Sequence, residues 1–329
     1  MSATATALDG VSLNVETLES REWKLNGIQI ALTDLSSTPQ KLTLSIKQLS
    51  LPLPFNDLNL FNIHCSSFTW QNKELLCTHG RAQVCSKQWQ SPTANFSFHI
   101  SEKQSTLSLT DLQLADGAVS IDAKEQDNHW QIQINAKAIN SVSLQKLLRP
   151  ALVELKGGRI NFKLTASGSQ ELIENFSLTT ELHGLTGQTK DGRFATEAVT
   201  LDTKLDAQNN KGSWQWQSHS NFKGGALYIE PLYLEADRQS IVMDAQGNWS
   251  DLLNRAEITS VSYNQAKALA ITGNAIVKFD KGITLEKADL SLHSEDLQKL
   301  SASYLKPFFE LTALEGISFA GTINGDFSI

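Results

Sequence analysis

The sequence lacks any apolar run long enough to cross a membrane. None of its 329 residues belongs to a stretch of the roughly 18–20 consecutive apolar residues that a spanning helix needs. The first residues, MSATATALDG, have neither the basic nor the apolar segment of a signal peptide. If the natural protein is exported or anchored, we expect its targeting segment to lie outside this sequence and Met1 to be an added start.

Positive charge is also scarce and dispersed. The chain has 28 lysines and arginines against 35 aspartates and glutamates, which gives a formal net charge of −7. Because nucleic-acid binding requires a basic stripe that neutralises phosphates, the sequence argues against nucleic acid as a partner. The same balance argues against docking on an anionic lipid surface by charge alone.

Motifs for catalysis are missing as well. The sequence contains no phosphate-binding loop, no dinucleotide-binding glycine pattern and no nucleophile elbow. Its seven histidines are scattered, without the spacing of metal ligands. Asp111, Asp202, Asp206 and Asp289 are typical of outward positions in strands or bends. We therefore expect a protein that is not an enzyme and that has no catalytic residues, no metal site and no cofactor.

Only three cysteines occur, all between residues 65 and 85, in CSSFTWQNKELLCTHGRAQVC. Phe68 and Trp70 predict one strand, residues 71–74 a turn, and residues 75–77 the returning strand. This hairpin would bring Cys65 and Cys77 together, so we favour a disulfide between them with Cys85 left over. The alternative is three buried thiols; a zinc site is disfavoured, since no C-x-x-C is present. A disulfide would indicate an oxidising compartment.

Alternation of apolar and polar residues with a period of two dominates the chain. It predicts an all-β protein whose antiparallel strands each have one apolar and one polar face. Short turn signals separate the runs. Examples of the alternation are Leu42-Leu44-Ile46, Phe96-Phe98-Ile100, Trp130-Ile132-Ile134, Ile160-Phe162-Leu164, Val199-Leu201 and Ile241-Met243; examples of the turns are Asp116-Gly117, Asp191-Gly192, Lys211-Gly212, Lys281-Gly282 and Asn324-Gly325.

An L-x-L-x-x-L-x-L pattern recurs in LSLTDLQL, residues 107–114, and less regularly in residues 42–51. The extra residue changes whether the odd or the even positions of the strand face inward, as a β-bulge does. Bulges let a long sheet bend and coil. Two strands joined by a tight bend would give the same pattern.

Helical spacing is confined to two segments, near residues 143–152 and 295–311, with Ser143 and Ser294 as N-caps. Residues 250–257 predict only a short turn. The two helical segments share the motif L-Q-K-L followed by a basic residue and proline, which indicates an internal repeat. We therefore divide the chain into an N-terminal β module, residues 1–142, and a C-terminal β module, residues 143–329, within one continuous sheet.

Together the repeated L-x-L-x-x-L-x-L strands, the glycine-bearing segments LKGGRINFKLTASG and LEGISFAGTINGDFSI, the helix-with-proline connections and the pattern of residues 25–30 give the chain a resemblance. It resembles the AsmA-like proteins of the Gram-negative envelope, of the YdbH and TamB type. The resemblance implies a periplasmic protein, anchored in the inner membrane by a segment absent here, whose long sheet is curled into an elongated groove. It further implies phospholipid transfer between inner and outer membranes, with envelope proteins at both membranes as partners. The missing membrane helix and the short length imply a segment of such a bridge, or a small relative.

A groove of this kind would hold phospholipid or another acyl-chain ligand on a regular apolar stripe, because burial of each methylene is worth about 0.8 kcal/mol. Three alternatives stay open: the core of a closed β-sandwich, a carbohydrate-binding or adhesive β-sandwich that uses Trp214 and Trp216, and an assembly scaffold that recruits partners at an edge strand. The candidate groove-lining residues are Ile132, Ile134, Ile160, Phe162, Leu164, Phe176, Leu178, Val199 and Leu201.

Overall fold

The described residues of this computed structural model form nineteen β-strands and very little helix. All strand pairings are antiparallel and belong to one sheet that is not closed into a barrel. This confirms the predicted all-β class and the long antiparallel sheet. The structure describes residues 8–20, 23–50, 58–86, 94–147, 153–170, 172–230, 232–236, 240–279, 282, 284–305 and 317–329.

The chain divides into two units, with the boundary at the short helix α1 (Ser141–Leu147). The strands of the first unit are β1 (Gly10–Glu19), β2 (Lys24–Thr33), β3 (Gln40–Ser50), β4 (Leu58–Gln71), β5 (Glu74–Ser86), β6 (Ala94–Ile100), β7 (Gln104–Leu114), β8 (Gly117–Gln126) and β9 (His129–Asn140). The strands of the second unit are β10 (Val153–Ser169), β11 (Leu172–Thr189), β12 (Phe194–Asn210), β13 (Ser213–Ile229), β14 (Leu232–Glu235), β15 (Ile241–Ser250), β16 (Arg255–Gln265), β17 (Leu269–Lys278), β18 (Thr284–Ser294) and β19 (Ile323–Ser328).

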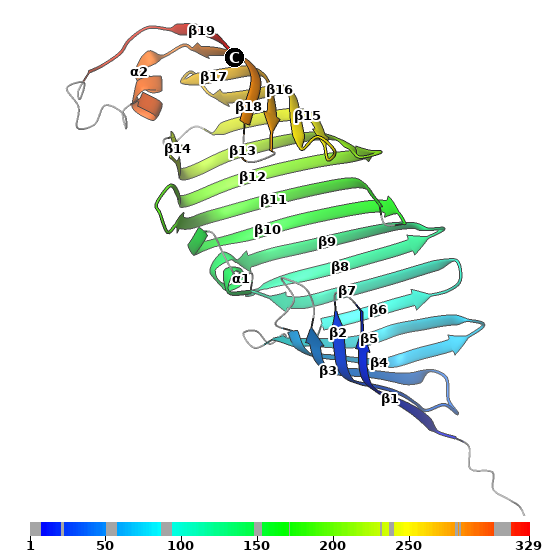
Figure 1. Cartoon of the computed structure of the whole chain (residues 1–329). Helices are drawn as coiled ribbons and strands as arrows, with labels where there is room; N and C mark the ends of the chain where they lie inside the picture. Colours follow the sequence, from blue (N-terminus) through cyan, green and yellow to red (C-terminus); the bar gives the residue numbers. More distant parts are fainter. Residues whose placement is uncertain are drawn as a thin grey trace, which may run out of the picture. The chain divides into compact units, whose positions relative to one another are not determined.

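In the first unit, successive strands of the chain pair as hairpins from β1 to β9 (Figure 1). The registers align the apolar positions of neighbouring strands, so that Leu42 lies opposite Cys65 and Phe96 opposite Leu109. One apolar cluster of this unit is centred on Cys65, Phe68 and Cys77. A second cluster joins the apolar positions of β2 and β3.

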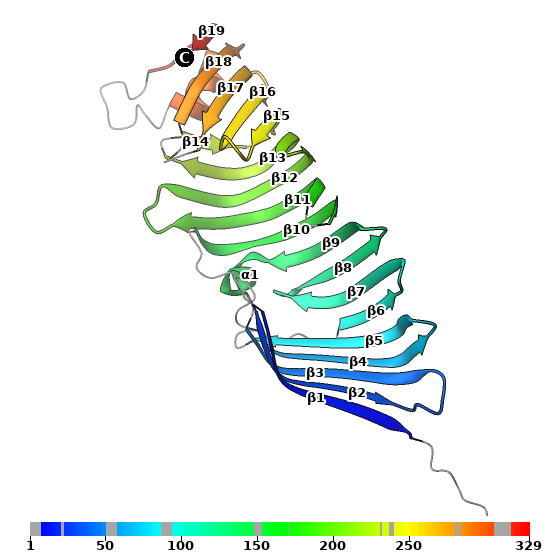
Figure 2. The same cartoon turned by 45° about the vertical axis from the view of Figure 1, so that its right-hand side comes forward.

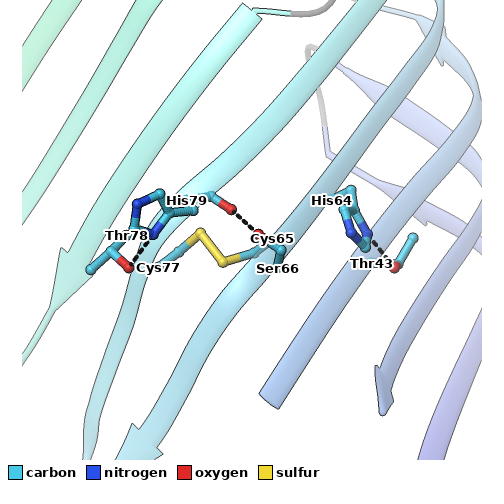
Figure 3. The surroundings of a disulfide bond; sticks show 7 residues. All are labelled: Thr43, His64, Cys65, Ser66, Cys77, Thr78 and His79. Carbon is cyan, nitrogen blue, oxygen red and sulfur yellow. Dashed lines mark hydrogen bonds between the residues drawn. A yellow bond between two sulfur atoms is a disulfide. The ribbon is translucent and has the colours of Figure 1, made fainter. Parts of the chain in front are cut away.

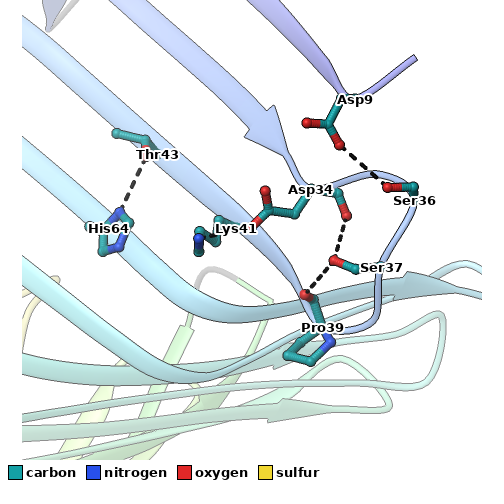
Figure 4. Close-up of polar contacts among 8 residues, drawn as sticks. All are labelled: Asp9, Asp34, Ser36, Ser37, Pro39, Lys41, Thr43 and His64. Atoms are coloured by element: carbon teal, nitrogen blue, oxygen red, sulfur yellow. Dashed lines mark hydrogen bonds and ion pairs between the residues drawn. The ribbon is translucent and has the colours of Figure 1, made fainter. Parts of the chain in front are cut away.

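The turn between β2 and β3 is held by local polar contacts (Figure 4). The Ser36 hydroxyl donates to an Asp9 carboxylate oxygen at 3.4 Å, and the Ser37 hydroxyl donates to the carbonyl of Asp34 at 3.0 Å. Lys41 forms an ion pair of 2.8 Å with Asp34. These contacts fix the reversal between two strands whose apolar faces must stay in register.

The interruption predicted within residues 107–114 is a β-bulge in a continuous strand, β7. The register with β8 shifts between Leu109 and Leu112, and Asp111 has a φ of 61°. Aspartate tolerates this left-handed backbone better than most residues do. The alternative of two strands joined by a bend is therefore wrong here.

In the second unit, strands β10–β13 are the longest of the chain, at 17 or 18 residues. They bow along their length in Figure 2, and their ladders contain several register shifts. One shift passes through Gly158, which has a φ of 118°, and a Cβ there would lie 2.6 Å from the Leu185 Cα. Glycine is required at this bulge for both reasons.

Both predicted helical segments contain helix where the structure describes them. The first covers Ser141–Leu147, and residues 148–152 of the predicted helix lie outside the described residues. The second consists of α2 (Leu297–Leu300) and a π-helical turn, η1 (Ser301–Leu305); residues 306–311 also lie outside the described part of the chain. None of the described helices is long and apolar enough to span a membrane.

Three local predictions at helix ends and turns are wrong. Ser143 lies inside α1, where the Asn140 side chain accepts from the backbone N–H of Val142 at 3.0 Å. Asp296, rather than Ser294, caps α2 and accepts from the backbone N–H of Lys299 at 3.1 Å. Asn324-Gly325, predicted as a turn, lies within β19. The predicted turn at residues 250–257 is confirmed over residues 251–254.

Candidate functional site

Apolar side chains occupy one face of the second unit's sheet across successive strands. We call this side the apolar face, and we call a series of ladder partners on successive strands a row. Because residues two apart on a strand share a face, the rows that begin at Ile160, Phe162, Leu164 and Ala166 of β10 all lie on the apolar face. One row runs Ile160, Leu182, Leu201, Phe222 and Ile241, from β10 to β15. Another runs Leu164, Leu178, Leu205, Ser218, Ala245 and Val261, from β10 to β16.

The apolar face carries no charged residue in these registered rows. Its polar members between β10 and β16 are mainly hydroxyl and amide side chains, and the hydroxyls of Thr203 and Ser220 lie 3.2 Å apart. The alternating residues on the other face are mainly charged or polar. There Lys204 pairs with Asp206 at 2.8 Å, and His219 lies 2.7 Å from Asp244. The two faces therefore differ strongly in character.

Most side chains of the apolar face are only half buried. Val199 is 4%, Phe222 3% and Ile241 0% exposed, but the rows around them stay partly accessible. The strands of the unit contact chiefly their ladder neighbours, and among the described residues no second sheet packs on this face. A face that is apolar yet incompletely covered is the feature expected of a surface that binds an apolar partner.

The seven candidate lining residues of the second unit all lie on the apolar face. Val199 is buried and the other six are half buried. Ile132 and Ile134 lie on β9 of the first unit, opposite Ala123 and Ile121, and are also half buried. The placement of these residues on apolar faces agrees with their alternation; their role in ligand binding stays a prediction.

Several members of the apolar face were not among the predicted lining residues. Leu182, Leu205 and Phe222 continue the rows of Ile160 and Leu164. Met243 and Tyr263 extend the face onto β15 and β16. Period-two alternation marks each of these positions as apolar, but only the register between strands shows that they belong to the same rows.

Trp214 and Trp216 lie on the apolar face, opposite Asn209 and Ala207 of β12. Both are half buried and share this side with aliphatic residues. An exposed aromatic platform surrounded by polar groups, which the carbohydrate-binding alternative requires, is not what these two residues form.

A helical segment covers part of the apolar face near β14 and β16. The hydroxyl of Tyr304 in η1 hydrogen-bonds with the hydroxyl of Tyr263 and donates to the side-chain oxygen of Gln265. The Gln265 amide in turn donates to the carbonyl of Glu235 at 3.3 Å. Burial raises the pKa of both phenols, and for Tyr263 the hydrogen bond with Tyr304 raises it further. This network fastens the segment to the sheet.

The opposite, polar face of the unit contains a shallow hollow of about 370 Å³. Lys204, Asp206, His219 and Asp244 contribute to its lining. Hydrogen bonds from Lys204 and Ser177 lower the pKa of Asp206. These pairs satisfy one another across the ladder, which is an ordinary way to stabilise a solvated sheet face. Among the described residues no cluster of histidine, cysteine or carboxylate could hold a metal ion.

In the first unit the predicted disulfide is present. Cys65 of β4 and Cys77 of β5 are bonded, with their Cα atoms 6.1 Å apart, and both residues are fully buried (Figure 3). Beside the disulfide, the Ser66 hydroxyl donates to the carbonyl of His79 at 3.1 Å. Cys85 is a free thiol, as expected, and lies half buried.

Comparison with protein-family models, with curated protein sequences and with solved structures finds no match to this chain. The geometry of the apolar face is that of a long, uncharged, partly accessible surface, which offers burial to hydrocarbon.

Proposed function

We propose that the apolar face of the second unit binds the acyl chains of lipids, without catalysis. The observation that carries this proposal is the way in which residues of the apolar face line up across neighbouring strands. Uncharged, mostly apolar residues follow one another across six strands, and most of their side chains are half exposed. Water contact of such a face is unfavourable, and an acyl chain lying along it would remove that contact.

The energetics favour a lipid tail over a polar ligand. Each methylene buried against the face contributes about 0.8 kcal/mol, so a tail is held by many small contacts. A charged or hydrogen-bonding ligand would find few partners there, because the polar side chains of the face, such as Thr203 and Ser220, are close enough to bond each other. Binding without a single preferred position would also allow a tail to slide along a row.

The wider role that we propose is phospholipid transfer in the periplasm, between the inner and outer membranes. Two features support it. The Cys65–Cys77 disulfide is buried in the first unit's core, and structural disulfides are typical of proteins that fold in oxidising compartments. The resemblance to AsmA-like envelope proteins points the same way, and it suggests envelope proteins as partners at each membrane.

The test is lipid occupancy of the protein after expression in bacteria. We expect native mass spectrometry to detect bound phospholipid on the wild-type chain. Leu178→Asp introduces a charge in the middle of the apolar face and should reduce occupancy several-fold. Thr179→Asp is the matched control, because Thr179 is the next residue of β11, is exposed and lies on the polar face. It should leave occupancy unchanged.

Two results would contradict acyl-chain binding: wild-type protein recovered without lipid, even after incubation with phospholipid, or equal occupancy of the two aspartate variants. Circular dichroism of each variant separates a loss of lipid from a loss of fold. Phospholipid binding with no transfer between donor and acceptor vesicles would retain the binding site and reject the proposed transfer.

A further inference from the structure

Large apolar side chains are exposed on the side of the second unit's sheet where β10, β12, β15 and β17 end. Four hairpin turns lie there, joining β10 to β11, β12 to β13, β15 to β16 and β17 to β18; the arrowheads of β10 and β12 point to this edge in Figure 1. We call it the turn edge. Six exposed large apolar residues lie at or next to these turns: Leu172, Ile173, Leu252, Leu253, Phe279 and Leu285.

The most exposed of these residues are at the turn between β15 and β16. Leu252 is 91% and Leu253 53% exposed, in the four-residue turn of residues 251–254. Turn tips normally carry glycine, proline, asparagine, aspartate or serine, for reasons of backbone geometry. Leu252 buries almost no area in the folded chain and Leu253 buries only about half of its own, so the exposure of this adjacent pair points to burial against something else.

Trp249, at the end of β15 next to this turn, belongs to an aromatic pair. The rings of Trp249 and Phe279 pack at 5.3 Å, and the Trp249 indole N–H donates to a carboxylate oxygen of Asp251 at 2.7 Å. Trp249 is also the ladder partner of Trp214 on the apolar face. An indole with an apolar body and a satisfied polar tip suits the boundary between water and hydrocarbon.

Charge at the turn edge is balanced. Arg255, which follows the leucine tip, pairs with Glu286 of β18 at 3.2 Å, and Lys287 pairs with Asp289 at 2.9 Å on that same strand. The whole chain is acidic, with a net charge of −7. The edge therefore has no basic field for anionic lipids, and its attraction to a membrane would come from apolar burial.

We propose that the turn edge docks on the interfacial region of a neutral phospholipid bilayer, with Leu252 and Leu253 inserted and Trp249 at the headgroup level. Trp249 is the ladder partner of Trp214, which lies on the apolar face. The docked edge would therefore adjoin the surface that we propose for acyl chains. The docking itself does not depend on that proposed function, because it uses the outside of the turns.

The experiment is flotation of the full chain with phosphatidylcholine vesicles. We expect wild-type protein to float with the vesicles, and the extent of flotation to change little with salt. The double variant L252D/L253D should reduce the floating fraction about tenfold or more, since two inserted leucines become charged. I229D is the matched control: Ile229 is 46% exposed and ends β13 at the opposite edge of the sheet. It should float as the wild type does.

The proposal is overturned if wild-type protein does not float or if L252D/L253D floats equally well. It is also overturned if the double variant changes only self-association in sedimentation velocity, since the partner would then be a second copy. Leu178→Asp separates this inference from the acyl-chain proposal: it should lose bound lipid and still float. A chain that floats but never carries lipid would reject only the acyl-chain site.

Discussion

The ring of Phe96 packs directly on the Cα of Gly80, its ladder partner across β5 and β6. A Cβ at residue 80 would overlap the ring, with the Phe96 Cε2 atom only 2.6 Å away. The aromatic side chain therefore occupies the space that glycine leaves open beside the buried disulfide. Phe96 also stacks on Phe98, with ring centroids 6.1 Å apart. The absence of a side chain at Gly80 is thus part of the packing of the first unit's core.

Substitution Gly80→Ala should destabilise the protein by about 1–3 kcal/mol, because the ring must move out of a packed position. Urea denaturation followed by fluorescence and circular dichroism measures the change. Gly224→Ala is the control: no atom lies within 4 Å of a Cβ built at Gly224 of β13, so its effect should be within about 1 kcal/mol of zero. Equal effects of the two substitutions would refute the packing argument.

Loss of the Cys65–Cys77 disulfide should also destabilise the protein. The Cys65–Cys77 bond closes a loop with a sequence separation of 12. Removing such a cross-link raises the entropy of the unfolded chain, and the double variant Cys65→Ala/Cys77→Ala should lose about 2–3 kcal/mol of stability. Cys85→Ala removes the free thiol and should change stability little. A thiol assay on unfolded wild-type protein without reductant should detect Cys85 alone; three reactive thiols would contradict the bond.

Asp206 should contribute to stability in a pH-dependent way. Hydrogen bonds from Lys204 and from Ser177, at 2.8 and 2.6 Å, lower the pKa of its carboxyl in the folded state. The contribution of this carboxylate to the free energy of unfolding is therefore complete above the ordinary aspartate pKa of about 3.9. It is lost as the pH falls through the lower pKa of the folded state.

The variant Asp206→Asn should consequently be about 0.5–1 kcal/mol less stable than wild type at neutral pH, a modest effect because Lys204 is largely exposed. The difference should shrink to zero in strong acid, as measured by urea denaturation at a series of pH values. Adding Lys204→Met to the asparagine variant should cost little more. A stability difference that stays constant from neutral to acidic pH would show that the carboxylate charge is irrelevant.

The sequence was sufficient to predict the features of this fold that are local. Alternation assigned Leu164 and Leu178 to apolar strand faces, the extra residue at Asp111 predicted a bulge, and the hairpin at residues 71–74 predicted the Cys65–Cys77 bond. Each of these follows from residues within about one strand length of one another, where periodicity and turn geometry decide the outcome.

Features that depend on long-range pairing were beyond local reasoning. Asn324-Gly325 has the composition of a turn, yet the ladder places Asn324 opposite His293 of β18 and Gly325 opposite Leu292. The contact of Tyr304 with Tyr263 joins residues 41 apart in sequence, through hydroxyl groups that no periodicity reveals. Candidate lining residues such as Leu205 were missed for a similar reason, since membership of a row is set by register.

The network of Tyr304 predicts a change in stability at alkaline pH. Burial raises the pKa of Tyr263 and of Tyr304, so both phenols keep their protons in the folded chain where exposed tyrosines ionise. The contribution of the two protonated phenols to the free energy of unfolding is complete below the ordinary tyrosine pKa of about 10. It is lost as the pH rises above that value. The helical segment that Tyr304 fastens to the apolar face should therefore be destabilised in alkali.

Phenolate absorbance at about pH 11 should accordingly be lower for the folded protein than for the denatured chain, because Tyr263 and Tyr304 stay protonated for longer in the folded state. Tyr304→Phe should shrink this difference and lower stability by about 0.5–1.5 kcal/mol, because Gln265 loses the hydroxyl that donates to it. Tyr228→Phe removes a hydroxyl outside this network and is the matched control for the change in stability. If Tyr304→Phe left both absorbance and stability unchanged, the hydroxyl contacts could not be what holds η1 on the sheet.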